Sequence, residues 1–384
     1  MKNQRWLSMS FFAFFFTWGV FLPYWTGWLT IEKGLSVTAA SFIMGAGMIA
    51  RSLSTFLIFP YLTRKISMIR VMKWISLTAL ILTLLYLPDS PFIVLLIITV
   101  LFSAIYPMIL PAVESGASIL MQIEGIHYGK SRSFGSIGYT VALLLIGAAT
   151  AIWTEQAILY IMIVGLTILT LFFMRPAPEA LRLNPVHDDT TKQAINFKSL
   201  LTSKEFAIVL LLAILLQGAH ASYYNFGFIF LDNLGVNGLY IGIILNIAVL
   251  FEILFFTRAD RLLANLKVST MFLIAGIGST VRWVLIALFP YISVFIGTQI
   301  LHALSFGVAH FAFIKFISQK LPHDQLATAQ GMYAAFAMSL STAILTFLGG
   351  YLYDVSPRLA FLGMIICSIP AIIIVLMTRK KYTY

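Results

Sequence analysis

The sequence predicts an all-α membrane protein with twelve transmembrane helices in two six-helix bundles. Of its 384 residues, 60% are hydrophobic and only 10% are charged, which leaves too few polar residues for the surface of a water-soluble fold of this size. The apolar residues form runs of about 18 to 26 residues, the length of helix that crosses a bilayer. Lysine and arginine gather in alternate loops between these runs, as they do in cytoplasmic loops.

The runs follow one another with short turns between them. The first run comes after Lys2 and Arg5 and carries several tryptophans in place of a small-residue cleavage site, so we expect a retained helix and not a signal peptide. Pro107 and Pro111 must bend the fourth run, because proline cannot continue the hydrogen bonds of a helix interior. The twelve runs span 5–30, 36–60, 68–88, 91–119, 132–153, 155–174, 205–231, 236–257, 268–288, 291–314, 325–350 and 358–378.

Charge distribution predicts the orientation. With both termini in the cytoplasm, only Lys33 and Arg358 fall outside, Arg51 and Arg282 fall inside runs, and every other basic residue is cytoplasmic. The sequence thus predicts a multi-pass protein of the bacterial inner membrane, with the lipid bilayer as its main partner.

Two halves are predicted, with one long polar stretch between them. Residues 1–174 form an N-terminal six-helix bundle, 175–204 a cytoplasmic connector rich in proline and charge, and 205–384 a C-terminal six-helix bundle. A weak repeat supports duplication, because the loops at 63–65 and 258–261 are basic and occupy equivalent places in the two halves.

Composition also excludes several function classes. The single cysteine, Cys367, rules out a disulfide framework or a CxxC site. The net charge of +11 comes from loop residues without interleaved aromatics, so no nucleic-acid partner is expected. A nucleophile–base pair and a metal-ligand spacing are both missing at membrane depth, so we expect no enzyme, no metal and no cofactor other than a coupling proton.

Six helices, a polar loop and six more helices resemble the major facilitator superfamily. The superfamily's signature loop runs Gly, three residues, Asp-Arg, then Gly and basic residues. Asp260 and Arg261 keep the central pair of that loop without its glycines, and the first copy, near Arg64, has lost the acid. The resemblance implies a secondary transporter that works as a monomer.

A closer resemblance extends along nearly the whole chain. Segments 5–25, 45–51, 217–224 and 299–302 resemble the bacterial 3-phenylpropionic acid transporter family, which is similar to the lactose permease branch of proton symporters. That branch's own pattern is matched by Pro-Ala-Val-Glu ending at Glu114 and by Gly129, Arg132, Phe134 and Gly135.

Glu114 and Arg132 are the central substrate-binding candidates. They lie eighteen positions apart across the hairpin joining runs four and five, so they can face each other on antiparallel helices. A carboxylate and a forked guanidinium in a low-dielectric site bind each other or a polar solute. A static ion pair, or a snorkelling arginine, stays open as an alternative. The lactose permease pattern implies substrate contact at both positions.

Further binding candidates follow from the resemblance and from position. Tyr139 lies two turns beyond Arg132, where the permease pattern implies a stacking aromatic, and packing is its alternative role. Arg51 matches the phenylpropionate family, and snorkelling is its alternative. The remaining substrate-binding candidates are Tyr24, Gln217, His220 and Tyr224, on runs that line the central cavity in this superfamily.

Charge at membrane depth favours an anionic solute. Glu114 and Glu252 stand against Arg51, Arg132 and Arg282, which leaves one surplus cation. With aromatic side chains around it, such a site suits a phenyl ring with a carboxylate tail.

Proton coupling is predicted in the second half. Glu252, Arg282 and His302 match the permease cluster, but its protonatable acid is replaced by Ser305 and its lysine by Gln299. Glu252 is the remaining candidate for the proton carrier. Burial favours the neutral form of a carboxyl group and a nearby arginine favours the charged form, so movement relative to Arg282 could load and release a proton. His302 and His310 could assist, with hydrogen-bonded packing as the alternative for each histidine.

The prediction is therefore a proton-coupled symporter that imports a small aromatic carboxylate, such as 3-phenylpropionate, by alternating access. A sugar or nucleoside symporter of the lactose permease type is the alternative within the class. A solute sensor or a channel is the alternative of another class, although no signalling domain is present and the charges do not form a ring.

Overall fold

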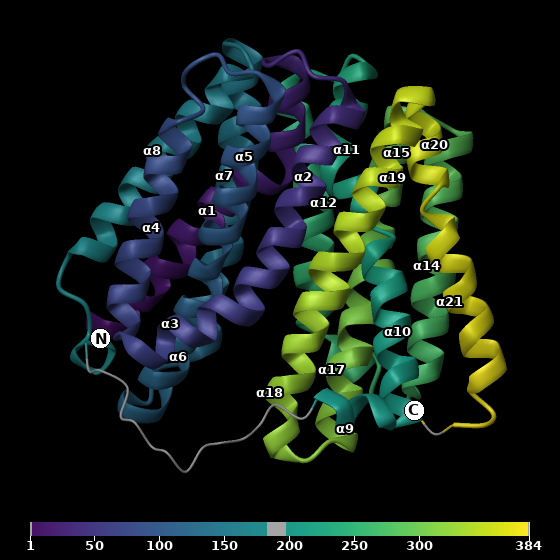
Figure 1. Ribbon diagram of the computed structural model, residues 1–384. Helices are drawn as coiled ribbons and strands as arrows, with labels where there is room; N and C mark the ends of the chain where they lie inside the picture. Colours follow the sequence, from purple (N-terminus) through teal and green to yellow (C-terminus); the bar gives the residue numbers. More distant parts are fainter. Residues whose placement is uncertain (1, 183–196, 383) are drawn as a thin grey trace. The chain divides into compact units, whose positions relative to one another are not determined.

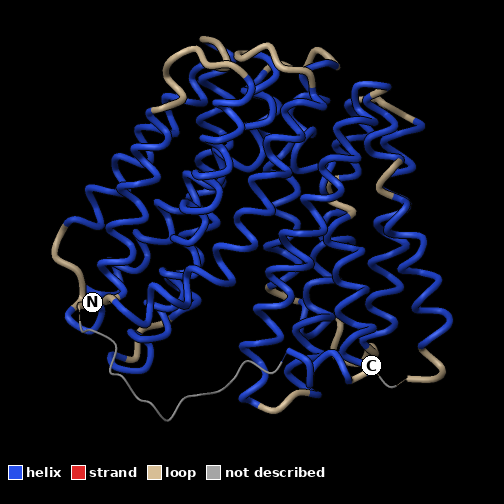
Figure 2. Tube along the Cα trace, viewed as in Figure 1, coloured by secondary structure: helices blue, strands red, loops and turns tan. Residues whose placement is uncertain are grey.

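The computed structural model describes residues 2–182, 197–382 and 384, and within these ranges the regular structure is entirely helical (Figures 1 and 2). The predicted all-α class is thus confirmed. The chain groups into two compact units, Met1–Thr190 with Asn237–Ile243, and Thr191–Val236 with Ile244–Tyr384. In the predicted connector, residues 183–196 lie outside the described residues.

The N-terminal unit contains the helices labelled α1 to α8, the purple to teal part of Figure 1. Two of its membrane runs change geometry along their length, one through a π-helix (η1) and one through a 3₁₀ turn (η2). The elements are α1 Lys2–Ile31, α2 Val37–Leu53, η1 Ser54–Ile58, α3 Phe59–Lys65, α4 Met68–Leu84, α5 Phe92–Ile105, η2 Tyr106–Met108, α6 Ile109–Glu124, α7 Tyr128–Ile152, α8 Gln156–Met174 and η3 Glu179–Leu181.

The C-terminal unit contains most of the green and yellow helices of Figure 1. Two further π-helices, η4 and η5, interrupt its membrane runs. The elements are α9 Phe197–Thr202, α10 Lys204–Gly218, α11 Ala221–Asn233, α12 Gly238–Phe256, α13 Ala259–Leu262, α14 Val268–Leu288, α15 Ile292–Thr298, α16 Ile300–His302, η4 Ala303–Gly307, α17 Val308–Lys320, α18 His323–Met332, η5 Tyr333–Leu340, α19 Ser341–Val355, α20 Pro357–Leu362 and α21 Ile365–Thr378. The first turns of α12 group with the N-terminal unit.

Eleven helical stretches among the described residues are long and apolar enough to cross a membrane. The predicted third run, 68–88, corresponds to α4, which has only 17 residues and is therefore about 25 Å long. It stops early because the backbone N–H of Leu85 already turns back to the carbonyls of Leu82 and Thr83. With α4 counted, the helices correspond to the twelve predicted runs.

Helix breaks occur at the predicted functional segments. The 3₁₀ turn at Tyr106–Met108 contains Pro107 and separates α5 from α6, as the prolines predict. The seventh run is broken between Gly218 and Ala221, and His220 lies in that break. The π-helices η1 and η4 begin shortly after Arg51 and His302, and π-helical turns are frequent at functional sites.

Glycines hold α1 against α7. A side chain at Gly138 would collide with the backbone of Phe12, and a Cβ at Gly19 would lie 2.9 Å from the Cβ of Ala142. Because only hydrogen atoms separate the helices at these points, the backbones approach closely. This contact places the aromatic face of α1 beside the charged start of α7.

Candidate functional site

The N-terminal unit brings Glu114 and Arg132 together, as the hairpin spacing predicts. Arg132 Nε lies 3.6 Å from Glu114 Oε1, and each side chain is about one third exposed, 35% and 34%. The hydroxyl of Tyr128 donates a hydrogen bond of 2.8 Å to the other oxygen, Oε2. The carboxylate is thus held from two positions one turn apart on α7 and stays open to an incoming solute.

Aromatic rings of α1 cover the guanidinium of Arg132. Its Cζ lies 4.1 Å from the ring centre of Phe15 and 5.8 Å from that of Phe11. A Cβ at Gly135 would lie 2.6 Å from the Phe15 ring and 2.9 Å from Arg132 Nη1. The glycine three residues after Arg132 therefore makes the room in which guanidinium and ring stack.

Arg51 lies on α2. Among the described residues, its contacts do not include Glu114 or Arg132. Its guanidinium covers the Trp18 ring, with 4.7 Å between Cζ and the ring centre. Both residues line a small pocket together with Ser103 and Pro107. The side chain is half-buried and engages a ring instead of extending alone into solvent.

Two predicted tyrosines lie where α1 contacts α7. Tyr24 is fully buried, and its hydroxyl donates to the backbone carbonyl of Leu143 at 3.1 Å. The Tyr24 hydroxyl thus binds a backbone carbonyl of α7. Tyr139 is half-buried and borders the close approach of α7 to Gly19.

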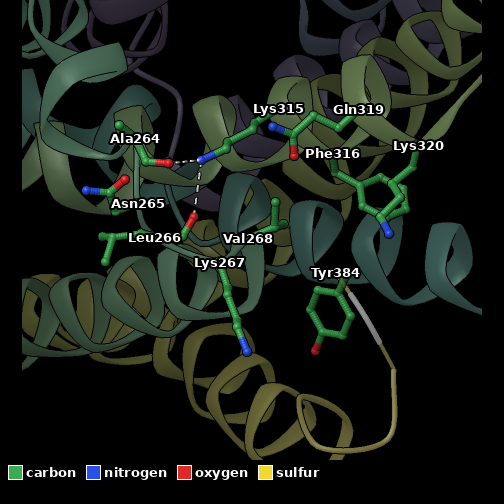
Figure 3. Close-up of a pocket in the computed structure, with 10 residues that line it drawn as sticks. All are labelled: Ala264, Asn265, Leu266, Lys267, Val268, Lys315, Phe316, Gln319, Lys320 and Tyr384. Atoms are coloured by element: carbon green, nitrogen blue, oxygen red, sulfur yellow. Dashed lines mark hydrogen bonds between the residues drawn. The ribbon is translucent and has the colours of Figure 1, made fainter.

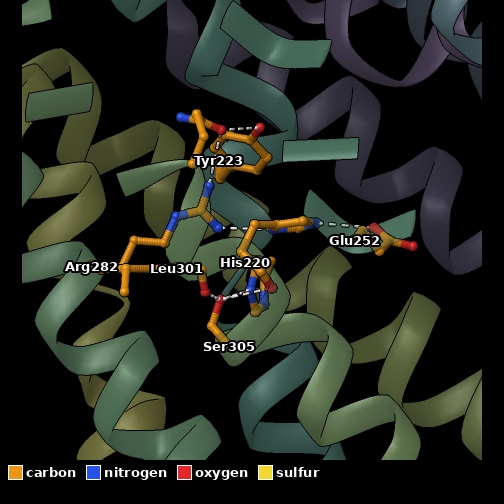
Figure 4. Close-up of polar contacts among 8 residues, drawn as sticks. His220, Tyr223, Glu252, Arg282, Leu301 and Ser305 are labelled. Atoms are coloured by element: carbon orange, nitrogen blue, oxygen red, sulfur yellow. Dashed lines mark hydrogen bonds and ion pairs between the residues drawn. The ribbon is translucent and has the colours of Figure 1, made fainter. Parts of the chain in front are cut away.

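In the C-terminal unit, Arg282 is fully buried and is the centre of a polar cluster (Figure 4). Its Nη1 lies 2.9 Å from His302 Nδ1, and its Nη2 donates to Gln299 Oε1 at 3.4 Å. The ring of Tyr223 lies 4.2 Å from its Cζ, and the Tyr223 hydroxyl donates to the same Gln299 oxygen at 2.8 Å. His302, Gln299 and the Tyr223 ring thus together stabilise one buried cation.

The contact with Arg282 determines which nitrogen of His302 carries the hydrogen. A guanidinium has only donors, so His302 Nδ1 must accept, and the hydrogen of the neutral ring sits on Nε2. Nε2 lies 3.4 Å from Glu252 Oε2. The sequence predicts that Arg282 lies near Glu252 and favours its charged form, and in the structure His302 contacts both residues.

His220 is held at the helix break by two hydrogen bonds. Its Nδ1 lies 2.9 Å from the carbonyl of Leu216, and its Nε2 lies 2.9 Å from Ser305 Oγ. The carbonyl requires a hydrogen on Nδ1, so in the neutral ring Nε2 is an acceptor. It faces the Ser305 hydroxyl, which also lies 2.9 Å from the carbonyl of Leu301. Ser305, which replaces the acid of the permease pattern, therefore positions a second histidine, whose ring centre lies 5.4 Å from that of His302.

The other predicted residues form a neighbouring chain. Gln217 donates to the Tyr333 hydroxyl at 2.9 Å, and that hydroxyl lies 2.8 Å from His310 Nδ1. The ring of Phe306 stacks between His302 and His310, with centre distances of 5.2 and 6.0 Å. The Tyr224 ring lies 5.9 Å from that of His220.

Several contributing residues have no assigned role in the sequence predictions. Tyr128 could have been found, because it precedes Arg132 by four residues on the same helix face. Gln299 could also have been found, because it precedes His302 by three. Tyr333 and Phe15 lie on separate helices and give no local signal.

A cavity of about 300 Å³ lies elsewhere, where α14 begins and α17 ends (Figure 3). The ammonium group of Lys315 donates there to the carbonyls of Leu263, Ala264 and Leu266 at 3.0 to 3.2 Å. Lys315 therefore holds the loop that follows α13 in place. The cavity is lined by none of the predicted site residues.

Comparison with known proteins agrees with this architecture. A family model described as the MFS_1 like family matches residues 4–363. A probable 3-phenylpropionic acid transporter of Escherichia coli (strain K12) is 27% identical over 375 residues, 97% of this chain and 97% of the relative. A maltose permease of Geobacillus stearothermophilus is 26% identical over 381 residues, 97% of this chain and 94% of the relative.

Solved structures share the fold. The nucleoside transporter NupG superposes with a TM-score of 0.83 at 17% identity, with all of both chains covered. A peptide transporter POT in complex with sulfate gives 0.77 at 12% identity, covering 98% of this chain and 93% of the other.

Proposed function

The chain belongs to the MFS_1-like family of membrane transporters, and we propose that it is a proton-coupled symporter that imports a small aromatic carboxylate such as 3-phenylpropionate. The membrane-transporter class rests on the family match over residues 4–363 and on the helical fold. The E. coli relative is described as a probable 3-phenylpropionic acid transporter, which supports this substrate class.

One observation carries the choice of an aromatic anion. Arg51, Arg132 and Arg282, the arginines assigned to membrane depth, each face an aromatic ring. The rings belong to Trp18, Phe15 and Tyr223 respectively. Only two carboxylates, Glu114 and Glu252, contact the described residues of these sites. The surplus positive charge favours an anion, and the rings favour a flat apolar body.

The chain from Glu252 through His302 to Arg282 supports proton coupling. Glu252 is 30% exposed in its side chain, whereas Arg282 is fully buried, so the carboxylate can exchange a proton while the cation stays enclosed. Protonation of Glu252 leaves the positive charge of Arg282 less compensated. The interior then holds one more net positive charge, which favours the binding of an anion together with the proton.

Alternating access would complete the cycle. We propose that the protein alternates between a state open to the outside and a state open to the cytoplasm, and that the breaks at Tyr106–Met108 and at His220 provide movable joints. The protein would act as a monomer in the bacterial inner membrane with both termini in the cytoplasm.

A neutral sugar or nucleoside is the second candidate substrate. It is favoured by the mutual neutralisation of Glu114 and Arg132 and by the maltose permease relative. A sensor would bind a solute without moving it, and a channel would not show counterflow, the transient uphill uptake of labelled solute driven by an outward gradient of unlabelled solute.

The test is uptake into proteoliposomes with the pH gradient imposed in either direction. We expect saturable uptake of labelled 3-phenylpropionate, faster when the outside is acidic, and competition by aromatic acids but not by maltose or nucleosides. Protein-free liposomes measure passive entry of the neutral acid. Saturable uptake of sugars alone would overturn the substrate assignment, and uptake that ignores the pH gradient would overturn the coupling.

A further inference from the structure

We propose that Arg51 is the residue that binds the carboxylate of the substrate, in a pocket built by α1, α2 and the break between α5 and α6. This inference rests on the proposed function and specifies it, because it assigns the surplus cation to one position. It also separates the residue that recognises substrate charge from the residues of the two ion-pair clusters.

Arg51 differs from Arg132 and Arg282 in its partners. Arg132 has Glu114 within 4 Å, and Arg282 donates to His302 and Gln299. Across the described ranges, no carboxylate lies within 4 Å of Arg51, and no described side chain or carbonyl accepts a hydrogen bond from its guanidinium. Among the described residues, Arg51 is thus the arginine of these three with neither a carboxylate within 4 Å nor a hydrogen-bond acceptor.

A half-buried guanidinium without acceptors has an energetic cost. The guanidinium has five N–H donors, and half-burial removes part of the water that would satisfy them. Stacking on Trp18 at 4.7 Å offsets only about 0.5 to 2 kcal/mol. A forked guanidinium in this position is complementary to a carboxylate, which accepts two parallel hydrogen bonds.

The pocket beside Arg51 is small and mostly apolar. It is lined by apolar and aromatic side chains with Ser103 as a second polar group, and it has room for about 10 Å³, roughly one water molecule. A carboxylate group, with three heavy atoms, is larger than that water and enters only when the pocket widens. The ring needs the flexible thioethers of Met44 and Met48 to rotate, which methionine does at low cost. The lining residues are Trp18, Phe21, Leu22, Met44, Met48, Arg51, Ser103 and Pro107.

Local packing explains why Arg51 reaches this pocket. A Cβ at Gly47 would lie 2.6 Å from Ser103 Oγ, so the glycine lets α2 approach α5 closely, one turn before Arg51. The π-helix η1 begins three residues after Arg51, which changes the direction of the side chains that follow. The arginine is thereby held at the pocket instead of pointing to the end of its helix.

The test compares an acid with its neutral amide. Competition of labelled 3-phenylpropionate uptake by unlabelled 3-phenylpropionate and by 3-phenylpropionamide should show a strong preference of the native protein for the acid. In R51Q we expect the acid to lose at least about thirtyfold in apparent affinity while the amide changes less than about twofold. R51K keeps the charge without the forked guanidinium. Its apparent affinity for the acid should lie between those of the native protein and R51Q. R70Q, which removes an exposed cation of α4, is the matched control.

The failures of the two proposals differ. If the native protein takes up no aromatic acid, the proposed function is wrong. If it does, and R51Q keeps the native acid-to-amide preference, the assignment of Arg51 is wrong.

A second measurement covers the case in which R51Q does not fold. In an L22C variant with Arg51 intact, the new cysteine lines the pocket, whereas the native Cys367 is buried. We expect 3-phenylpropionate to slow alkylation of Cys at this position and the amide to have little effect. Equal alkylation rates with and without the acid would overturn the assignment.

Discussion

The two units hold their arginines in opposite ways. In the N-terminal unit, Arg132 is about one third exposed and Arg51 is half-buried, and each stacks on a ring with few or no hydrogen-bond partners. In the C-terminal unit, Arg282 is fully buried and is linked to His302, Gln299 and the rings of two aromatic residues.

This difference separates binding from stability. A half-exposed cation can exchange water for a solute, so its removal should change transport more than folding. A fully buried cation has lost its water, so its partners become uncompensated when it is removed. We therefore expect the N-terminal unit to carry recognition and the C-terminal cluster to couple protonation to structure.

The largest expected effect is on folding. Arg282→Gln leaves His302 Nδ1 and Glu252 without their buried positive partner, and breaking such an arrangement costs about 3 to 5 kcal/mol. Thermal unfolding in detergent, followed by a thiol-reactive dye on the buried Cys367, should show a clearly lower Tm. Arg132→Gln is the control and should shift the Tm little. Equal shifts in both variants would remove the contrast between the units.

The next effect is on uptake. Glu114→Gln and Arg132→Lys should each reduce uptake of the labelled acid about a hundredfold, because each loses an interaction between charged, forked groups worth about 1.5 to 3 kcal/mol. Surface expression and Tm should stay close to native. Normal uptake by both variants would show that the pair is only structural.

A smaller effect is expected at Tyr128. Its hydroxyl donates a hydrogen bond of 2.8 Å to Oε2 of the Glu114 carboxylate. Tyr128→Phe keeps the ring and deletes one charge-assisted bond, which should raise the KM about fivefold to tenfold with an unchanged Tm. An unchanged KM would place Glu114 outside the substrate's reach.

Much of the fold is readable in the sequence, because helix length, proline positions and loop charge are local properties. Glu114 and Arg132 could be paired for the same reason, since a short hairpin joins their helices. The role of Tyr24 could not be predicted, because its partner is a backbone carbonyl of α7. Nor could the placement of His302 between Glu252 and Arg282, which depends on how three separate helices pack.

Residues that depart from the family pattern have contacts that the pattern does not predict. Ser305 replaces an acid, which alone suggests a lost proton site. In the structure it supports His220, whose position in a helix break no periodicity reveals. Side chains on distant segments acquire their roles from tertiary packing, and local patterns carry no record of it.

The most direct test of the central claim is the proton movement that accompanies uptake. When 3-phenylpropionate is added to lightly buffered proteoliposomes, the account predicts saturable alkalinisation of the external medium above that of protein-free liposomes, lost in Glu252→Gln while exchange of labelled for unlabelled substrate persists. Saturable uptake of the acid without any protein-dependent alkalinisation would contradict it.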